Sequence, residues 1–97
     1  LKFVMRHGAE PWTALACKLM LKYPNLYYST SAFSPKHYPK DIINYANTRG
    51  KNKIMYAGYF PMGLSLDKIF SEMDDVPFND DVWPCFLGEN AKKLLKL

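Results

Sequence analysis

The sequence is poor in the side chains that build metal clusters and disulfide frameworks. It has two cysteines, Cys17 and Cys85, and two histidines, His7 and His37. The cysteines show no CxxC spacing and no nearby pair of histidines, so neither a disulfide framework nor a structural zinc site is indicated. Because both thiols lie among apolar residues, we expect them to be buried in a protein of the reducing cytoplasm.

Long apolar runs and basic clusters are also missing. No segment approaches the roughly 18–20 apolar residues of a transmembrane helix, and no signal peptide is evident, so we expect no membrane binding. The formal net charge of +4 comes from scattered lysines rather than a block of like charges. We therefore expect no nucleic-acid partner. The G-x-S-x-G turn of many serine hydrolases is absent too.

What the sequence does contain is a globular pattern, with 48% hydrophobic and 15% aromatic residues among its 97. Apolar spacing and turn residues predict alternating strands and helices. The predicted order is a strand at 2–6, a helix at 11–23, a strand at 26–30, a helix at 39–49, a strand at 53–57, a helix capped by Ser65, and a final helix at 82–95 interrupted near Gly88. This alternation favours an α/β fold with parallel strands.

Three parallel strands make a poor domain by themselves, because such strands need cover on both faces and leave two open edges. The chain also opens with Leu1 directly inside a strand-like run. We therefore expect a fragment that lacks an amino-terminal part and packs against it.

His7 is the first candidate for chemistry, because it follows a predicted strand and precedes a helix. The carboxyl ends of strands are where α/β barrels place their active sites. Spacing alone favours an ordinary strand-end histidine with a satisfied hydrogen bond. Trp12 opens the following helix and could form a pocket wall, but its shared helical face with Leu15 and Leu19 favours a core position.

Three segments resemble motifs of one family. They are residues 7–12 (His-Gly-Ala-Glu-Pro-Trp), residues 53–62 (Lys-Ile-Met-Tyr-Ala-Gly-Tyr-Phe-Pro-Met) and residues 86–97 (Phe-Leu-Gly-Glu-Asn-Ala-Lys-Lys-Leu-Leu-Lys-Leu). They are similar to the H-G-G/A-x-x-P/W signature, the strand-eight motif Phe-Gly-Ser-Asp-Tyr-Pro and the closing helix of the amidohydrolase-2 family. These are metal-dependent hydrolases and decarboxylases related to aminocarboxymuconate-semialdehyde decarboxylase.

The resemblance implies a (β/α)8 TIM barrel, of which residues 1–97 would form the last three βα units and the closing helix. Segments 1–8, 26–30 and 53–57 would be strands six, seven and eight. The first five units would supply the family's His-x-His metal ligands and a further histidine. His7 corresponds to the family's strand-six histidine, a candidate general base near the metal-bound water.

The sequence departs from the family at Tyr59, which stands where the metal-binding aspartate of strand eight belongs. A neutral phenol is a poor ligand for a divalent ion such as zinc. Three interpretations stay open: the protein binds its metal with fewer ligands, uses Tyr59 as a donor to substrate, or has lost metal chemistry.

The leading hypothesis is the carboxyl-terminal part of an amidohydrolase acting on a small carbonyl-containing substrate, with His7 catalytic and Tyr59 and Trp12 contacting substrate. No metal ligand is assigned within these residues, so the fragment alone should be inactive. One alternative is a non-oxidative decarboxylase of the same family. Another is a non-enzymatic binding module with an aromatic-rich surface. The expected partners are a small-molecule substrate and the rest of the barrel, with a homo-oligomer as a further option.

Overall fold

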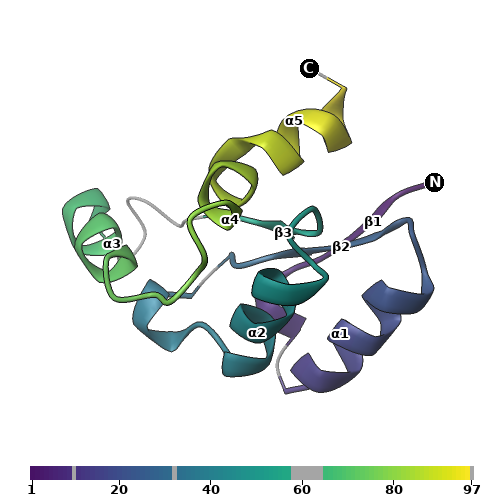
Figure 1. Ribbon diagram of the computed structural model, residues 1–97, viewed down its shortest axis with the longest axis horizontal. Helices are drawn as coiled ribbons and strands as arrows, with labels where there is room; N and C mark the ends of the chain where they lie inside the picture. The colour runs from purple at the N-terminus through teal and green to yellow at the C-terminus, as the bar shows by residue number, and fades with distance from the viewer. Residues whose placement is uncertain (10, 32, 58–64, 97) are drawn as a thin grey trace.

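A computed structural model describes residues 1–9, 11–31, 33–57 and 65–96 (Figure 1). Strands and helices alternate along the chain, as the sequence pattern predicts. The elements are β1 (Phe3–Met5), η1 (His7–Ala9), α1 (Thr13–Lys22), β2 (Leu26–Ser29), η2 (Pro35–His37), α2 (Lys40–Thr48), β3 (Ile54–Met55), α3 (Leu66–Met73), α4 (Val82–Pro84), η3 (Cys85–Glu89) and α5 (Asn90–Leu95).

The three strands form one parallel sheet in the order β1-β2-β3. Met5 pairs with Tyr28, and Tyr28 pairs with Ile54, so these three residues lie in one row across the sheet. Tyr28 and Ile54 are fully buried in the core, and Met5 packs against it. The predicted fold class, α/β with parallel strands, is confirmed.

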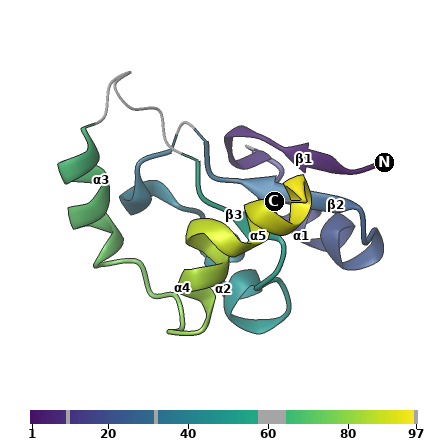
Figure 2. The same ribbon diagram turned by 90° about the horizontal axis from the view of Figure 1, so that it is seen from above.

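Helices α1 and α2 contact each other and lie together on one side of the strands in Figure 1. Met20 of α1 and Ile42 of α2 belong to the core cluster that also holds the buried strand residues. Helix α3 begins after Ser65, whose hydroxyl accepts the Lys68 N–H at 3.2 Å, so the predicted cap is confirmed. In both views α3 stands at the opposite end of the molecule from the amino terminus (Figure 2).

Elements α4, η3 and α5 follow one another without a break, and together we call them the closing helix (residues 82–95). Its middle segment, η3, is a π-helix that contains Gly88, so the predicted interruption lies where expected. Phe86 is almost fully buried, and its carbonyl accepts the Tyr56 N–H at 2.9 Å. This contact joins the closing helix to the end of β3.

Asn90 is a polar residue that is buried in the closing helix, and its side chain has hydrogen-bond partners there. Its side-chain amide donates to the carbonyl oxygens of Lys51 at 2.8 Å and Ile54 at 2.9 Å. Because a buried carbonyl without a partner is costly, this amide stabilises the entry into β3. Asn90 belongs to residues 86–97, the segment that resembles the family's closing helix, and the structure gives it this structural role.

Helix α1 and the residue before it are less buried than the sequence predicts. Trp12 and Leu15, expected in the core, are 66% and 51% exposed. Only Ala16 and Met20 of α1 are buried.

Cys17 and Cys85, also expected to be buried, are partly exposed. None of the helices in the described ranges combines the length and apolar character needed to cross a lipid bilayer.

Candidate functional site

The carboxyl ends of the three strands meet at one edge of the sheet, because the strands are parallel. His7 follows β1 by two residues, and Ser31 follows β2 by two residues. The residues after β3 at this edge are Tyr56 and Ala57. We call this the C-terminal edge, and it is where the sequence-predicted catalytic residue lies.

His7 and Ser31 make three close contacts across this edge. The backbone N–H of His7 donates to Ser31 Oγ at 2.9 Å. The ring nitrogen Nδ1 of His7 lies 3.2 Å from Ser31 Oγ and 3.4 Å from the Ser31 carbonyl oxygen. Ser31 is buried, whereas His7 is exposed. A fixed serine therefore holds one side of an imidazole that solvent reaches.

The backbone of His7 is in the left-handed region, with φ of 54°, and so is that of Ala9. Such conformations cost about 1–3 kcal/mol for residues with a Cβ and persist only where the surroundings enforce them. Here the Ala9 N–H donates to the Arg6 carbonyl, and the Trp12 N–H donates to the Ala9 carbonyl. Together with the His7–Ser31 bond, these contacts turn the chain sharply at the end of β1.

Ser31 is itself held by the end of β2. Its N–H donates to Ser29 Oγ at 3.2 Å. The adjacent Thr30 is fully buried; its N–H donates to the Met55 carbonyl, and its hydroxyl oxygen accepts the Ala57 N–H. These bonds tie the ends of β2 and β3 together, so Ser31 is a rigid support for His7.

Tyr38 brings a buried polar group to the same region. Its hydroxyl has no hydrogen-bond partner among the described residues. Burial raises the pKa of Tyr38 to about 12, and the neighbouring Thr30 side chain opposes this rise in part. The ring packs edge-on against Phe86, with centroids 5.9 Å apart. At neutral pH the phenol is therefore a neutral donor and not a base.

Glu72 of α3 fixes the loop that follows β2. Its carboxylate accepts the hydroxyl of Ser34 and the N–H of Lys36. The hydrogen bond from Ser34 lowers the pKa of Glu72 below its ordinary value, with the Lys36 N–H and nearby lysines acting in the same direction. Sequence reasoning missed this contact, since residues 34 and 72 are joined only through the fold.

The other two predicted site residues are not brought to His7 by any described contact. Trp12 lines an apolar hollow of about 370 Å³ along α1, shared with Met5 and Leu15. Tyr59 lies outside the described residues.

No three His, Cys, Asp or Glu side chains in residues 1–9, 11–31, 33–57 and 65–96 could hold one metal ion together. The donor sets that zinc prefers comprise three or four such ligands. The described residues therefore do not fit a metal centre of their own, and we derive no chemical step through a metal here.

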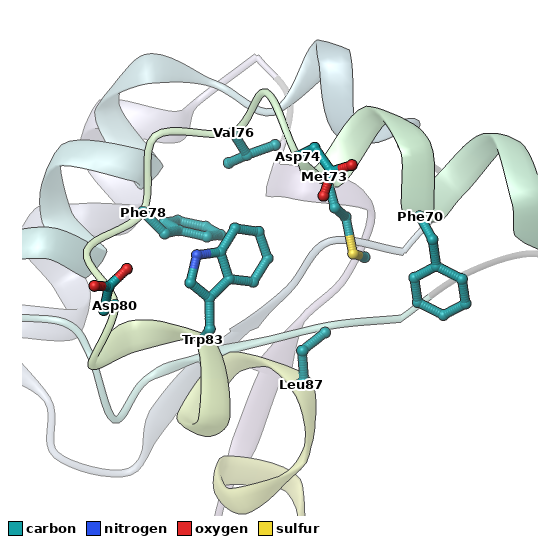
Figure 3. A pocket seen from close by; sticks show the side chains of 8 residues that line it. All are labelled: Phe70, Met73, Asp74, Val76, Phe78, Asp80, Trp83 and Leu87. Carbon is teal, nitrogen blue, oxygen red and sulfur yellow. The ribbon is translucent and has the colours of Figure 1, made fainter.

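A larger hollow of about 500 Å³ lies between α3 and the closing helix (Figure 3). The ring of Trp83 stands in its middle, with Phe78 behind it and Phe70 across from it. The lining residues that the structure describes come from positions 70–87, and none of them lies directly after a strand. Among them only the exposed Asp74 and Asp80 are titratable, so these residues provide neither the acid–base pair nor the nucleophile of a reaction site.

A model of the family described as amidohydrolase matches residues 1–97. An uncharacterized TIM-barrel protein from Bordetella bronchiseptica has a similar crystal structure, with a TM-score of 0.85 and 26% sequence identity. That match covers 99% of this chain and 34% of the Bordetella chain. A search of curated proteins finds no match.

The two matches agree with each other and with the order of elements. The chain spans about a third of the length of the TIM-barrel protein that it resembles, and its parallel βα units have the geometry of part of such a barrel. Because the family match extends from the first residue to the last, the chain belongs to the amidohydrolase family.

Proposed function

We propose that this chain forms strands six to eight and the closing helix of an amidohydrolase barrel of the aminocarboxymuconate-semialdehyde decarboxylase type. The complete barrel hydrolyses a small carbonyl-containing substrate. His7 is its acid–base residue. The observation that supports this most directly is the joining of His7, after β1, to Ser31, after β2, at the C-terminal edge.

That edge supports a catalytic role because TIM-barrel enzymes assemble their active sites from the loops at the carboxyl ends of the strands. His7 is exposed there, so a substrate or water molecule can reach the ring. In hydrolysis a base takes a proton from the attacking water and later returns one to the leaving group. An imidazole suits both steps near neutral pH.

The family is generally metal-dependent, and we propose a divalent ion, zinc, for the complete barrel. Its ligands would come from outside the described residues, because those residues offer no suitable donor set. The contribution of the described chain is to place the His7 imidazole and the walls around it. Trp12 and Tyr59 remain proposed substrate contacts, the first as an apolar wall and the second as a phenolic donor.

The first test is the reading frame that precedes the codon for Leu1. We expect it to encode five further βα units with a His-x-His motif near their start. A frame that encodes an unrelated domain, or a start codon just before Leu1, would contradict the barrel proposal.

The second test is enzymatic. The protein translated from the complete frame, supplied with zinc, is assayed against small amides, esters, lactones and carboxylated analogues. Proton transfer by a positioned histidine typically contributes 10²- to 10⁴-fold, so we expect His7→Gln to lower kcat/KM by at least about 10²-fold. His37→Gln is the matched control, because His37 is an exposed histidine on η2. Equal losses in both variants would rule out the assigned role. The 97-residue chain alone should show no turnover.

A further inference from the structure

We propose that Ser31 is a positioning residue that selects the Nδ1–H tautomer of His7, so that Nε2 is the atom that accepts the proton. This inference rests on the proposed acid–base role of His7, but the tautomer can be measured without any turnover. From the sequence, Ser31 is a strand-end hydroxyl that could contact a substrate or cap local backbone, and nothing in the sequence connects it with His7.

Two oxygens of Ser31 face the ring nitrogen Nδ1 of His7. The hydroxyl oxygen lies 3.2 Å and the carbonyl oxygen 3.4 Å from that nitrogen. A carbonyl oxygen can only accept a hydrogen bond. If Nδ1 carried no proton, its lone pair would face the lone pairs of the carbonyl, which is repulsive.

A proton on Nδ1 removes this conflict. One N–H can be shared between two acceptors, and such three-centre bonds have long distances to both. The hydroxyl oxygen of Ser31 has two lone pairs. One accepts the His7 backbone N–H at 2.9 Å, and the other can accept Nδ1–H. Because the hydroxyl can equally donate to a bare Nδ1, the carbonyl, which only accepts, decides between the two tautomers. Both donors of His7 on this side are thus matched to acceptors on a single buried residue.

The same arrangement serves the ring after it has taken up a proton. The imidazolium keeps its Nδ1–H, so its contacts to Ser31 are unchanged while Nε2 gains the proton. Ser31 does not move between these states, because its own N–H is bonded to Ser29 and the neighbouring Thr30 is bonded to β3. A ring held by a fixed partner reacts at one nitrogen in one orientation, as second-sphere partners of catalytic histidines achieve elsewhere.

The experiment is ¹⁵N NMR of the histidine rings, which distinguishes a protonated from an unprotonated ring nitrogen. With two histidines in the sequence, His37→Gln assigns the signals, and His37 itself is the internal reference in the other variants. In the wild type we expect neutral His7 to show a protonated Nδ1 and an unprotonated Nε2. Ser31→Ala keeps the carbonyl but removes the hydroxyl that holds both the His7 backbone N–H and the ring nitrogen Nδ1 in front of it. The exposed ring should then turn away from the carbonyl, and His7 should shift toward a mixture of tautomers. Ser31→Thr, which restores a hydroxyl, should recover the wild-type pattern.

Ser34→Ala is the control for loss of a buried serine hydroxyl, because Ser34 contacts Glu72 and makes no described contact with His7. It should leave the His7 signals unchanged. A protonated Nε2 in the neutral wild type, or His7 signals that Ser31→Ala does not move, would overturn the proposal. In the active barrel we expect Ser31→Ala to lower kcat on the order of tenfold with KM unchanged.

The two proposals fail in different ways. If His7→Gln retains full activity, the acid–base role is wrong even where the tautomer is as expected. If His7→Gln is inactive but the tautomer does not depend on Ser31, only the positioning role is wrong.

Discussion

The two edges of the sheet, which we call the β1 side and the β3 side, are covered to very different degrees. On the β3 side, the closing helix buries Ile54 and Phe86 to within 1% of full burial, and Asn90 satisfies two backbone carbonyls. On the β1 side, Phe3 is 58% and Trp12 66% exposed.

The difference shows that the closing helix shields the β3 edge within this chain and that nothing in the described residues shields the β1 edge in the same way; in the proposed barrel both edges would pair with further strands. A parallel strand is normally flanked by other strands and covered by helices. Both β1 and β3 are edge strands of this sheet, but β3 has the closing helix beside it, whereas β1 has exposed apolar side chains. In the Bordetella TIM-barrel protein, the matched region is 34% of a longer chain. This supports the proposal that further βα units pack against the β1 side.

The largest expected effect tests the covered side directly. Phe86→Ala removes a ring that packs against four others, with centroids 5.0–6.0 Å away. Such a truncation of a buried ring costs about 3–5 kcal/mol of the free energy of unfolding, measured by urea denaturation. Phe3→Ala is the matched control on the open side and should cost less than about 1 kcal/mol. Equal losses would mean that the two sides do not differ.

The next effect concerns the polar link on the covered side. Asn90→Ala leaves the Lys51 and Ile54 carbonyls without their donors, and we expect a loss of about 2–3 kcal/mol. Asn90→Asp should be at least as damaging, because a carboxylate would face two carbonyl oxygens. Asn44→Ala, on the exposed part of α2, should stay within about 0.5 kcal/mol. The same denaturation measurement distinguishes these outcomes.

The elements that follow from local patterns were predicted well, and the contacts that depend on register were not. Ser65 caps α3 because a hydroxyl before an apolar helix is a local signal. Periodicity also located the apolar face of α1, but periodicity says nothing about whether a neighbour covers that face, so the core position expected for Trp12 was wrong. The bond between His7 and Ser31 needs the pairing of Met5 with Tyr28, which no local pattern supplies.

A smaller effect tests the buried hydroxyl of Tyr38, for which no hydrogen bond is found among the described residues. Tyr38→Phe removes a buried hydroxyl that has no well-formed hydrogen bond among the described residues and whose desolvation the Thr30 side chain offsets only in part, so it should raise the free energy of unfolding by up to about 1 kcal/mol. The pKa of Tyr38 is raised from 10.0 to about 12, so the folded state holds the proton more tightly than the unfolded state. The contribution of Tyr38 to wild-type stability should therefore be full below pH 10 and be lost as the pH rises toward 12. The variant should show a shallower fall, and an unchanged slope would contradict the assignment.

The smallest expected change in stability tests α1, on the less covered β1 side. Leu15 is 51% exposed on α1, so Leu15→Lys should change the free energy of unfolding of this chain by no more than about 0.5 kcal/mol. Exposed apolar patches beside an edge strand promote association, so the same charge should weaken self-association of the chain, measured by sedimentation velocity. Leu95→Lys is the control, because Leu95 is 64% exposed on α5, at the other side of the sheet.

In the complete barrel we expect the same Leu15→Lys substitution to lower the free energy of unfolding. If a preceding βα unit covers α1, the lysine is placed against apolar neighbours, and the cost rises to about 2 kcal/mol or more because a buried charge is poorly tolerated. Leu95→Lys should remain neutral unless its surroundings change as well. A Leu15→Lys variant that is neutral in both the short chain and the complete protein would show that no further unit packs on the β1 side, and the barrel proposal would fail with it.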